Sequence, residues 1–507
     1  MLFWYNKRMK RFIFTLLIFL QLLGASTLHL AISASPARIN PILSTDTATS
    51  EITQWLFNSL VTYDKDGKII PQLAKSYKFL DQKTLEFTLR DDVYWSDGVK
   101  FSAKDVLFTY ETIISPKIYT PYAASFYHIK SVKIVDKNKI IVRYKYPYFK
   151  ALDIWMMEVL PYHKLKDEKD LMTSKFNQSP IGTGSYTLKK ASVSSDVILH
   201  ANKNYFIHKP KIDRIVYHFV PDSSAQFLML KSAKLDVGSL TPLQLERQLD
   251  DNFRKKFNIF ETISHSYLYV GFNLRLKKFK NPKVRQALSL AIDRDEIVKI
   301  MYFGHGKVCN GPFLPGTGAY DKTVKSPKQN IKKAKELLKE AGYDAKHPFI
   351  FTISTNTGSG GSYIAQILQH QFKKAGIVMN LKVMEWQAFL NTVIMPRKFE
   401  AVLMAWALSI RPDAYSIWHS KSDKKGGFNF IGYKNKQVDT LIEKAQSTIN
   451  KEKFNKIYQK IFALIVRDNP YLFLVIPNAI TVVNKKISPV SPSLIGVMHN
   501  EIEWQKE

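Results

Sequence analysis

Cysteine and acidic residues are scarce in this sequence. Cys309 is the only cysteine among 507 residues, which excludes an intrachain disulfide and a cysteine-rich metal site. The 43 aspartates and glutamates are outnumbered by 74 lysines and arginines, so the formal net charge is +31. Because no run of five or more basic residues occurs, this charge favours solvated surfaces over a nucleic-acid partner.

Catalytic signatures are absent as well. The sequence has no phosphate-binding G-x-x-x-x-G-K-[ST], no H-E-x-x-H, no C-x-x-C and no G-x-S-x-G. The glycine-rich stretch at 357–363 does not fit a dinucleotide-binding loop, and the 12 histidines are dispersed. We therefore expect a binding protein and no enzyme, with no cofactor and no preformed metal site.

The first residues predict export. A cluster of basic residues precedes the apolar run "FIFTLLIFLQLL", which ends in "GAS": Lys7, Arg8, Lys10 and Arg11. This order is typical of a secretory signal peptide, and the run is too short to span a bilayer comfortably. We predict a signal peptide over residues 1–26. No lipid anchor is expected, because no cysteine lies near the cleavage site.

Strand patterns occur early in the chain. Apolar and polar side chains alternate over residues 84–89, which predicts a strand, and residues 139–146 show a second strand pattern. The sequence "DKDG" at 64–67 predicts a hairpin turn, since it lacks the later ligands of a calcium loop.

Helix patterns dominate the second half. Apolar residues at helical spacing between Pro327 and Gly342 predict a helix, and residues 362–385 predict a helix followed by a strand. A long helical stretch over 437–468 leads to the strand pattern "NPYLFLVIP". The whole is an α/β chain, and its length predicts two or three domains.

A stretch that starts at Leu73, "LAKSYKFLDQKTLEFTLRDDVYWSDGVKFSAKDVLFTYE", resembles the signature of the family 5 extracellular solute-binding proteins. These are the peptide- and nickel-binding receptors of ABC importers. The segments "PIGTGSYTL", "VRQALSLAIDRDEIV" and "FNFIGYKNKQVDTLIEKA" resemble later motifs of the same family. The signature residues are Ala74, Ser76, Tyr77, Asp81, Thr84, Phe87, Leu89, Arg90, Trp95, Asp97, Gly98, Ala103, Asp105 and Val106.

The resemblance implies a type 2 periplasmic binding protein fold, in which two lobes are joined by a hinge. The N-terminal lobe would comprise 27–50, 176–265 and 479–507, with an extra domain inserted at 51–175. The second lobe would comprise 266–478. Ligand would be held between the lobes, and closure would present a shape that the membrane permease recognises.

The stretch "AWALSIRPDAYSIWHS" at 405–420 is expected to border the ligand. Peptide-binding members of the family hold the peptide's amino terminus with an aspartate three residues after a tryptophan. Here that position is Ser409, which leaves the ligand open, while Asp413 either substitutes for the aspartate or caps the following helix. Further expected contacts in this stretch are Trp406, Arg411 and Tyr415.

Other segments are expected to contribute to the same cleft. The inserted domain offers aromatic side chains, and the second lobe offers polar and aromatic groups after its strands. These candidates are Tyr122, Tyr127, Trp155, Asn356, Glu385 and Trp386.

The resemblance implies a periplasmic, monomeric peptide receptor that delivers its ligand to permease subunits in the inner membrane. A nickel or nickel-chelate receptor on the same fold is the alternative, and His419 or His265 would then be the metal ligand. A chaperone-like or adhesive surface protein that uses its cationic face is a third hypothesis.

Overall fold

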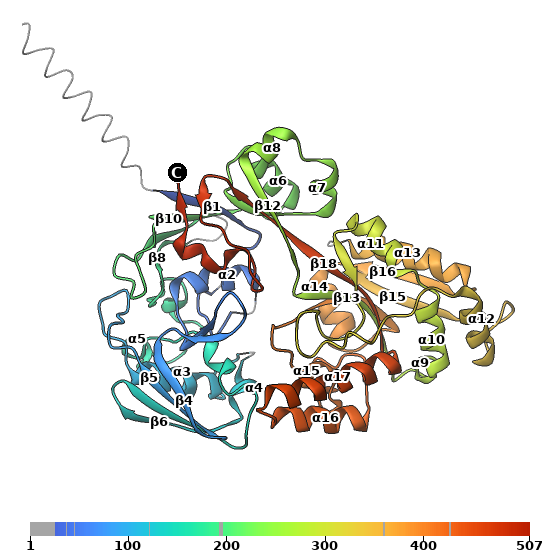
Figure 1. Ribbon diagram of the computed structural model, residues 1–507, viewed down its shortest axis with the longest axis horizontal. Helices are drawn as coiled ribbons and strands as arrows, with labels where there is room; N and C mark the ends of the chain where they lie inside the picture. The colour runs from blue at the N-terminus through green and yellow to red at the C-terminus, as the bar shows by residue number, and fades with distance from the viewer. Residues whose placement is uncertain are drawn as a thin grey trace, which may run out of the picture.

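The computed structural model describes residues 26–36, 38–44, 46–120, 122–191, 196–357, 360–424 and 427–507. All but the last residue of the predicted signal peptide therefore lies outside the described residues. Figure 1 shows two bodies side by side, which strands β12 and β18 connect. The first body contains residues 27–219 and the C-terminal segment 485–507. The second body contains residues 266–476.

The first body has two four-stranded sheets. One has the order β1-β10-β9-β8, with β1 parallel to β10, and the other has the order β4-β5-β7-β6. One continuous apolar core runs from Leu28 to Trp504 and contains residues of both sheets. The elements are β1 (Thr27–Ile32), α2 (Thr47–Leu56), β2 (Val61–Tyr63), β3 (Ile69–Pro71), β4 (Ala74–Asp81), β5 (Thr84–Leu89), α3 (Ala103–Ile114), β6 (Ile129–Asp136), β7 (Lys139–Tyr144), η1 (Asp153–Met156), β8 (Tyr186–Lys190), β9 (Val197–Ala201) and β10 (Arg214–Phe219).

The strand and turn predictions in this body are confirmed. Strand β5 buries Leu85, Phe87 and Leu89 on one face, as the alternation predicted. The "DKDG" turn joins β2 to β3: the Asp64 carboxylate accepts hydrogen bonds from the backbone N–H groups of Asp66 and Lys68.

Two of the segments that resemble family motifs have a structural role in this chain. The backbone N–H of Gly184 donates to the carbonyl of Leu56 at 2.8 Å, and a Cβ added at Gly182 would lie 1.7 Å from that same oxygen. The two glycines of "PIGTGSY" therefore allow this loop to pack directly against the end of α2. At the start of α3, the buried Asp105 carboxylate accepts from the N–H groups of Ser102 and Tyr162, which caps the helix.

An eight-stranded sheet of order β11-β18-β13-β17-β15-β16, with β12 and β14 also paired to β18, forms the base of the second body and extends beyond it through β11 and β12. Two apolar cores, one on each side, cover it. Its elements are β13 (Ser266–Phe272), α10 (Pro282–Leu290), α11 (Arg294–Tyr302), β14 (Gly306–Val308), α12 (Ile331–Glu340), β15 (Ile350–Asn356), α13 (Gly361–Lys374), β16 (Val378–Met384), β17 (Ala401–Ala407), α15 (Tyr415–Trp418), α16 (Lys436–Gln446), α17 (Lys451–Asp468) and β18 (Tyr471–Asn484).

The helix predictions hold with two refinements. Helix α12 begins at Ile331, later than Pro327 suggested, because the side chain of Asn330 caps it by accepting from the N–H of Lys333. The stretch 437–468 forms two helices, since Asn450 caps α17 in the same way. Helix α13 followed by β16 is the helix and strand that the sequence predicted, and β16 lies parallel to β15, which completes a β-α-β unit.

A small unit lies between the bodies at the top of Figure 1. It contains α6 (Ser223–Lys231), β11 (Val237–Leu240), α7 (Pro242–Arg247), α8 (Asp251–Lys256) and β12 (Phe257–Ile263). Strand β12 pairs with residues 478–484 of β18, while β13 pairs with residues 471–475 of the same strand. The chain thus passes between the bodies at two adjacent places, 263–266 and 475–478. The lobe boundaries inferred from the resemblance remain a prediction.

Candidate ligand cavity

A cavity of about 780 Å³ lies between the two bodies. The first body lines it with the β2–β3 hairpin, strand β4, the loop before η1 and the segment at 493–494. The second body contributes the loops at 314–319 and 410–412 and the start of α17, and the crossover contributes residues 262, 263 and 265. Its size falls within the range of about 300–1,000 Å³ that is usual for small-ligand pockets.

Aromatic and aliphatic side chains form much of the wall. Phe149 of the first body stacks on Phe454 of α17, with ring centroids 5.0 Å apart, so this contact bridges the two bodies. Four large apolar side chains in the lining keep more than a third of their surface exposed: Phe79, Ile263, Ile449 and Leu494. Apolar surface left open in a cavity favours a ligand with an apolar part.

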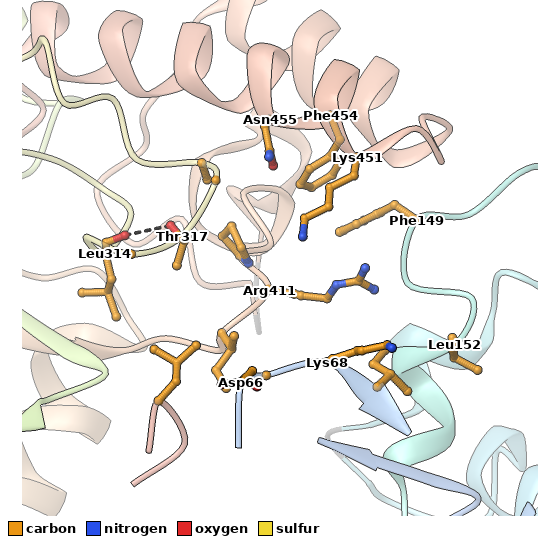
Figure 2. A pocket seen from close by; sticks show the side chains of 18 of the residues that line it. Asp66, Lys68, Phe149, Leu152, Leu314, Thr317, Arg411, Lys451, Phe454 and Asn455 are labelled. Atoms are coloured by element: carbon orange, nitrogen blue, oxygen red, sulfur yellow. Dashed lines mark hydrogen bonds between the residues drawn. The ribbon is translucent and has the colours of Figure 1, made fainter. Parts of the chain in front are cut away.

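Cations dominate the charged part of the lining. Figure 2 shows the side chains of Lys68, Arg411 and Lys451 extending into the space between α17 and the β2–β3 hairpin. His265 also lines the cavity, and Asp66 is the only carboxylate in the lining among the described residues. The cavity can therefore place positive charge beside a ligand from both bodies.

Two ion pairs join the bodies next to the cavity. Arg411 Nη1 lies 2.5 Å from Asp153 Oδ2, and Lys150 Nζ lies 3.2 Å from Asp413 Oδ2. The backbone N–H of Phe149 also donates to the carbonyl of Gln446 at 3.0 Å. Asp153 further accepts from the hydroxyl of Tyr63 at 3.3 Å, and burial raises the pKa of that hydroxyl above its ordinary value. The 411–413 loop is thus held to the first body at two charged points.

The residues predicted between 405 and 420 are placed in three different environments. Arg411 lines the cavity. The Ser409 hydroxyl donates to the carbonyl of Arg411 at 2.5 Å and shapes the loop that presents it. Asp413 accepts from the N–H of Tyr415, the first residue of α15, in addition to its pair with Lys150. Ser409, Asp413 and Tyr415 are not among the lining residues.

Trp406 packs against an apolar core of the second body. It is half-buried on β17, nearly parallel to Tyr269 and Phe430 at centroid distances of 6.1 and 5.7 Å. Its indole N–H donates to the hydroxyl of Tyr471 at 3.2 Å. Trp406 is not part of the cavity lining.

The two histidines that would bind nickel in the alternative hypothesis, His419 and His265, lie in different environments. His419 is 1% exposed, stacks on Tyr415 at 4.3 Å and lies 3.3 Å from the Glu443 carboxylate, so it is enclosed away from the cavity. His265, by contrast, lines the cavity at the crossover. Among the described residues, no group of three or more His, Cys, Asp or Glu is arranged to hold a metal ion.

The candidates from the first body lie outside the lining. Trp155 is 4% exposed and its indole N–H donates to the Tyr144 hydroxyl, so it belongs to the core. Tyr122 donates to the Ser44 carbonyl at 2.9 Å, and Tyr127 is 57% exposed. None of the three contacts the cavity in this structure.

The remaining candidates follow the strands of the second body. The Asn356 side chain donates to the Thr357 carbonyl at 2.7 Å, and the Glu385 carboxylate accepts from the Ala388 N–H at 3.0 Å. Trp386 is 42% exposed and contacts Phe389. These side chains make local contacts at or just after the ends of β15 and β16, and they too are outside the lining.

Sequence reasoning missed most of the lining, including four residues that matter for the proposals below: Lys68, Phe149, Lys451 and Phe454. Phe149 belongs to an aromatic-rich stretch that was expected to border the cleft, so a signal for it existed. Lys451 and Phe454 lie in the first turn of a helix whose pattern indicates only that it is amphipathic. Lys68 follows a hairpin turn of ordinary composition. These four side chains line one cavity only because of the way in which the two bodies contact each other.

Comparison with known proteins decides the family. Residues 68–428 match the bacterial extracellular solute-binding proteins, family 5. The oligopeptide-binding protein AppA of Bacillus subtilis is 33% identical over 469 residues, which cover 87% of this chain and 84% of AppA. The chain belongs to family 5. The type 2 periplasmic binding protein fold expected from the sequence, two lobes with a domain inserted in the first, is thereby confirmed.

Solved structures of family 5 proteins superpose on nearly the whole chain. AppA from B. subtilis in complex with a nonapeptide is 29% identical with a TM-score of 0.83, and the match covers 96% of this chain and 100% of AppA. NikZ from Campylobacter jejuni in complex with Ni(L-His) is 31% identical with a TM-score of 0.84, again covering 96% and 100%. The family thus includes a protein solved with a peptide and a protein solved with a nickel–histidine complex, and the two are about equally similar to this chain. No helix in the described part of the chain is long and apolar enough to cross a membrane.

Proposed function

We propose that this family 5 protein is the substrate-binding component of an ABC importer and captures peptides between its lobes. The observation that carries the proposal is the cavity of about 780 Å³, which both bodies line with apolar and charged side chains. AppA, the peptide-binding relative, matches over 87% of the chain at 33% identity. A peptide held there contacts both bodies at once and therefore favours the arrangement in which they touch.

The proposal includes the cellular setting. The signal peptide at 1–26 directs the chain to the periplasm, where it acts as a monomer without a lipid anchor. Permease subunits in the inner membrane receive the loaded form. The protein binds and releases its ligand without changing it chemically.

The roles of the lobes follow the predicted boundaries. The first lobe (27–50, 176–265 and 479–507, with the inserted domain 51–175) presents Lys68 and Phe149, and the second lobe (266–478) presents Arg411 and Lys451. Ser409 and Asp413 act indirectly, by fixing the loop that carries Arg411. Rotation about the two crossovers opens and closes the cavity.

A nickel-chelate receptor is the second candidate, and the position of His265 favours it. This histidine lines the cavity, and NikZ, which was solved with Ni(L-His), is 31% identical to this chain. Because the described residues offer no group of three metal-binding side chains, such a receptor would need a chelator to supply most of the ligands to nickel.

Thermal unfolding tests the two candidates against each other. A ligand at 100 times its Kd stabilises the folded state by about 2.7 kcal/mol, so binding raises Tm. We expect a pool of short peptides to raise Tm and nickel with histidine to leave it unchanged. A rise with nickel and histidine alone would replace the peptide proposal with the nickel one, and the His265→Ala variant would then lose that rise.

A further inference from the structure

We propose that the cavity selects peptides that carry acidic side chains. The inference rests on the proposed peptide-binding function and adds the substrate class, which neither the family nor its named relatives specify. It follows from the charges that remain unpaired in the lining and from the apolar surface beside them.

The lining has an excess of positive charge. It contains three permanently charged cations, Lys68, Arg411 and Lys451, against one carboxylate, Asp66, which gives 3 − 1 = +2 with His265 neutral. Asp153 lies just outside the lining and pairs with Arg411, which reduces the local excess to +1. A ligand amino group therefore meets repulsion here, and a carboxylate meets attraction.

Lys68 and Lys451 carry this excess. Both side chains are exposed, and neither ammonium group has an ion-pair or hydrogen-bond partner in the described part of the chain; Figure 2 shows one on each side of the cavity. A carboxylate of the ligand can form a charge-assisted hydrogen bond with either exposed ammonium group. A neutral or basic side chain in the same place cannot supply this interaction.

The apolar wall sets the second requirement. Phe79, Ile263, Ile449 and Leu494 remain partly exposed in the lining, so a purely polar anion leaves them in water. A peptide that alternates apolar and acidic side chains satisfies both surfaces together. The net charge of the chain without the four cations of the signal peptide, 31 − 4 = +27, also attracts anionic ligands over a longer range and raises their association rate.

Calorimetric titration of the chain from Thr27 onward with three matched peptides tests the inference. The peptides are Leu-Glu-Leu-Glu-Leu, Leu-Gln-Leu-Gln-Leu and Leu-Lys-Leu-Lys-Leu, all with free termini, so the terminal charges are constant. We expect the glutamate peptide to bind at least tenfold more tightly than the glutamine peptide, and the lysine peptide to bind most weakly. The preference should shrink as salt is added, because salt screens charges.

Variants assign the preference to the two lysines. Lys68→Met combined with Lys451→Met should bring the glutamate and glutamine peptides within twofold of each other. The matched control, Lys332→Met with Lys373→Met, removes the same charge from exposed positions on α12 and α13 and should keep the full preference.

The possible outcomes distinguish a failure of the acidic preference from a failure of the proposed peptide binding. Equal affinity for all three peptides would overturn the acidic preference and leave peptide capture intact. A preference that survives the Lys68/Lys451 double variant would overturn the assignment to these residues. Absence of binding to any of the three peptides, together with binding of the nickel–histidine complex, would overturn the proposed function and this inference with it.

Discussion

Aromatic and polar residues in the stretch 405–420 divide between the cavity and the interior. Arg411 reaches the cavity, while Trp406 and His419 are enclosed by other rings and carboxylates. The sequence could indicate that this stretch lies near the cleft, because motifs on both sides place it there. It could not separate lining from core, since large aromatic side chains serve both purposes equally well.

Replacing Trp406 by alanine should mainly lower stability. The ring packs against Tyr269 and Phe430, so its loss removes buried contacts and should reduce the free energy of unfolding by about 2–3 kcal/mol. Peptide affinity of the folded variant should change less than twofold. Urea unfolding and calorimetry measure the two effects, and unchanged stability with a large loss of affinity would place Trp406 at the ligand instead.

At the scale of elements, periodic segments were predictable, whereas one helix break and the close approaches were not. Helix α13 and strand β16 follow from local patterns, but the cap at Asn450 that separates α16 from α17 was not predicted within the stretch 437–468. The contact between the "PIGTGSY" loop and the end of α2 joins segments more than 120 residues apart, so only the family resemblance marked those glycines as special.

Gly182→Ala should destabilise the protein strongly. Its Cβ would lie 1.7 Å from the Leu56 carbonyl oxygen, a rigid backbone atom, so the loop must move. We expect a loss of about 3 kcal/mol or more, in the upper range for overpacking. Gly342→Ala is the control: it is strained by its positive φ but meets no atom within 4 Å, so about 1 kcal/mol is expected. An equal loss in the free energy of unfolding for both variants would contradict the close contact between Gly182 and the Leu56 carbonyl.

His305 should make the junction between α7 and α11 sensitive to pH. Its ring meets Glu246 of α7 at 2.8 Å and Glu261 of β12 at 3.0 Å, and Asn478 of β18 also donates to Glu261. Burial lowers the pKa of His305, but hydrogen bonds to Glu246 and Glu261 more than offset this, so its pKa lies above the ordinary 6.5.

A raised pKa in the folded state stabilises the fold below the unfolded-state pKa of 6.5, and this contribution is lost as pH rises through the folded-state pKa. His305→Gln should therefore lower the free energy of unfolding more at about pH 6 than at about pH 9. Denaturant unfolding at the two pH values measures the difference. A cost that is independent of pH would show that the imidazolium is not what the two glutamates stabilise.

At the scale of the whole molecule, the cavity exists only because the two bodies meet. The family resemblance predicts a cleft between lobes, but the identity of the facing side chains depends on the angle between them. This is why Lys451 and Phe454, at the start of an ordinary amphipathic helix, could not be assigned to the ligand from sequence. The contacts beside the cavity, Arg411 with Asp153 and Lys150 with Asp413, depend on the same arrangement.

The Lys150–Asp413 pair should contribute to closure. Both side chains are partly buried, at 18% and 32% exposed, so the pair is worth about 1 kcal/mol in a double-mutant cycle with Lys150→Ala and Asp413→Asn. If closure and binding are coupled, peptide Kd should rise about fivefold when the pair is broken. Lys332→Ala is the control on an exposed helix position. Additive effects of the two single variants would show that the pair does not hold the lobes together.

Mass spectrometry of the intact protein under native conditions, purified from the cells that export it, tests the central claim most directly, because a closed cleft retains its ligand. The account predicts a bound peptide of several residues, and a mixture enriched in aspartate and glutamate if the acidic preference holds. A bound nickel–histidine complex with no peptide in the same preparation would contradict it.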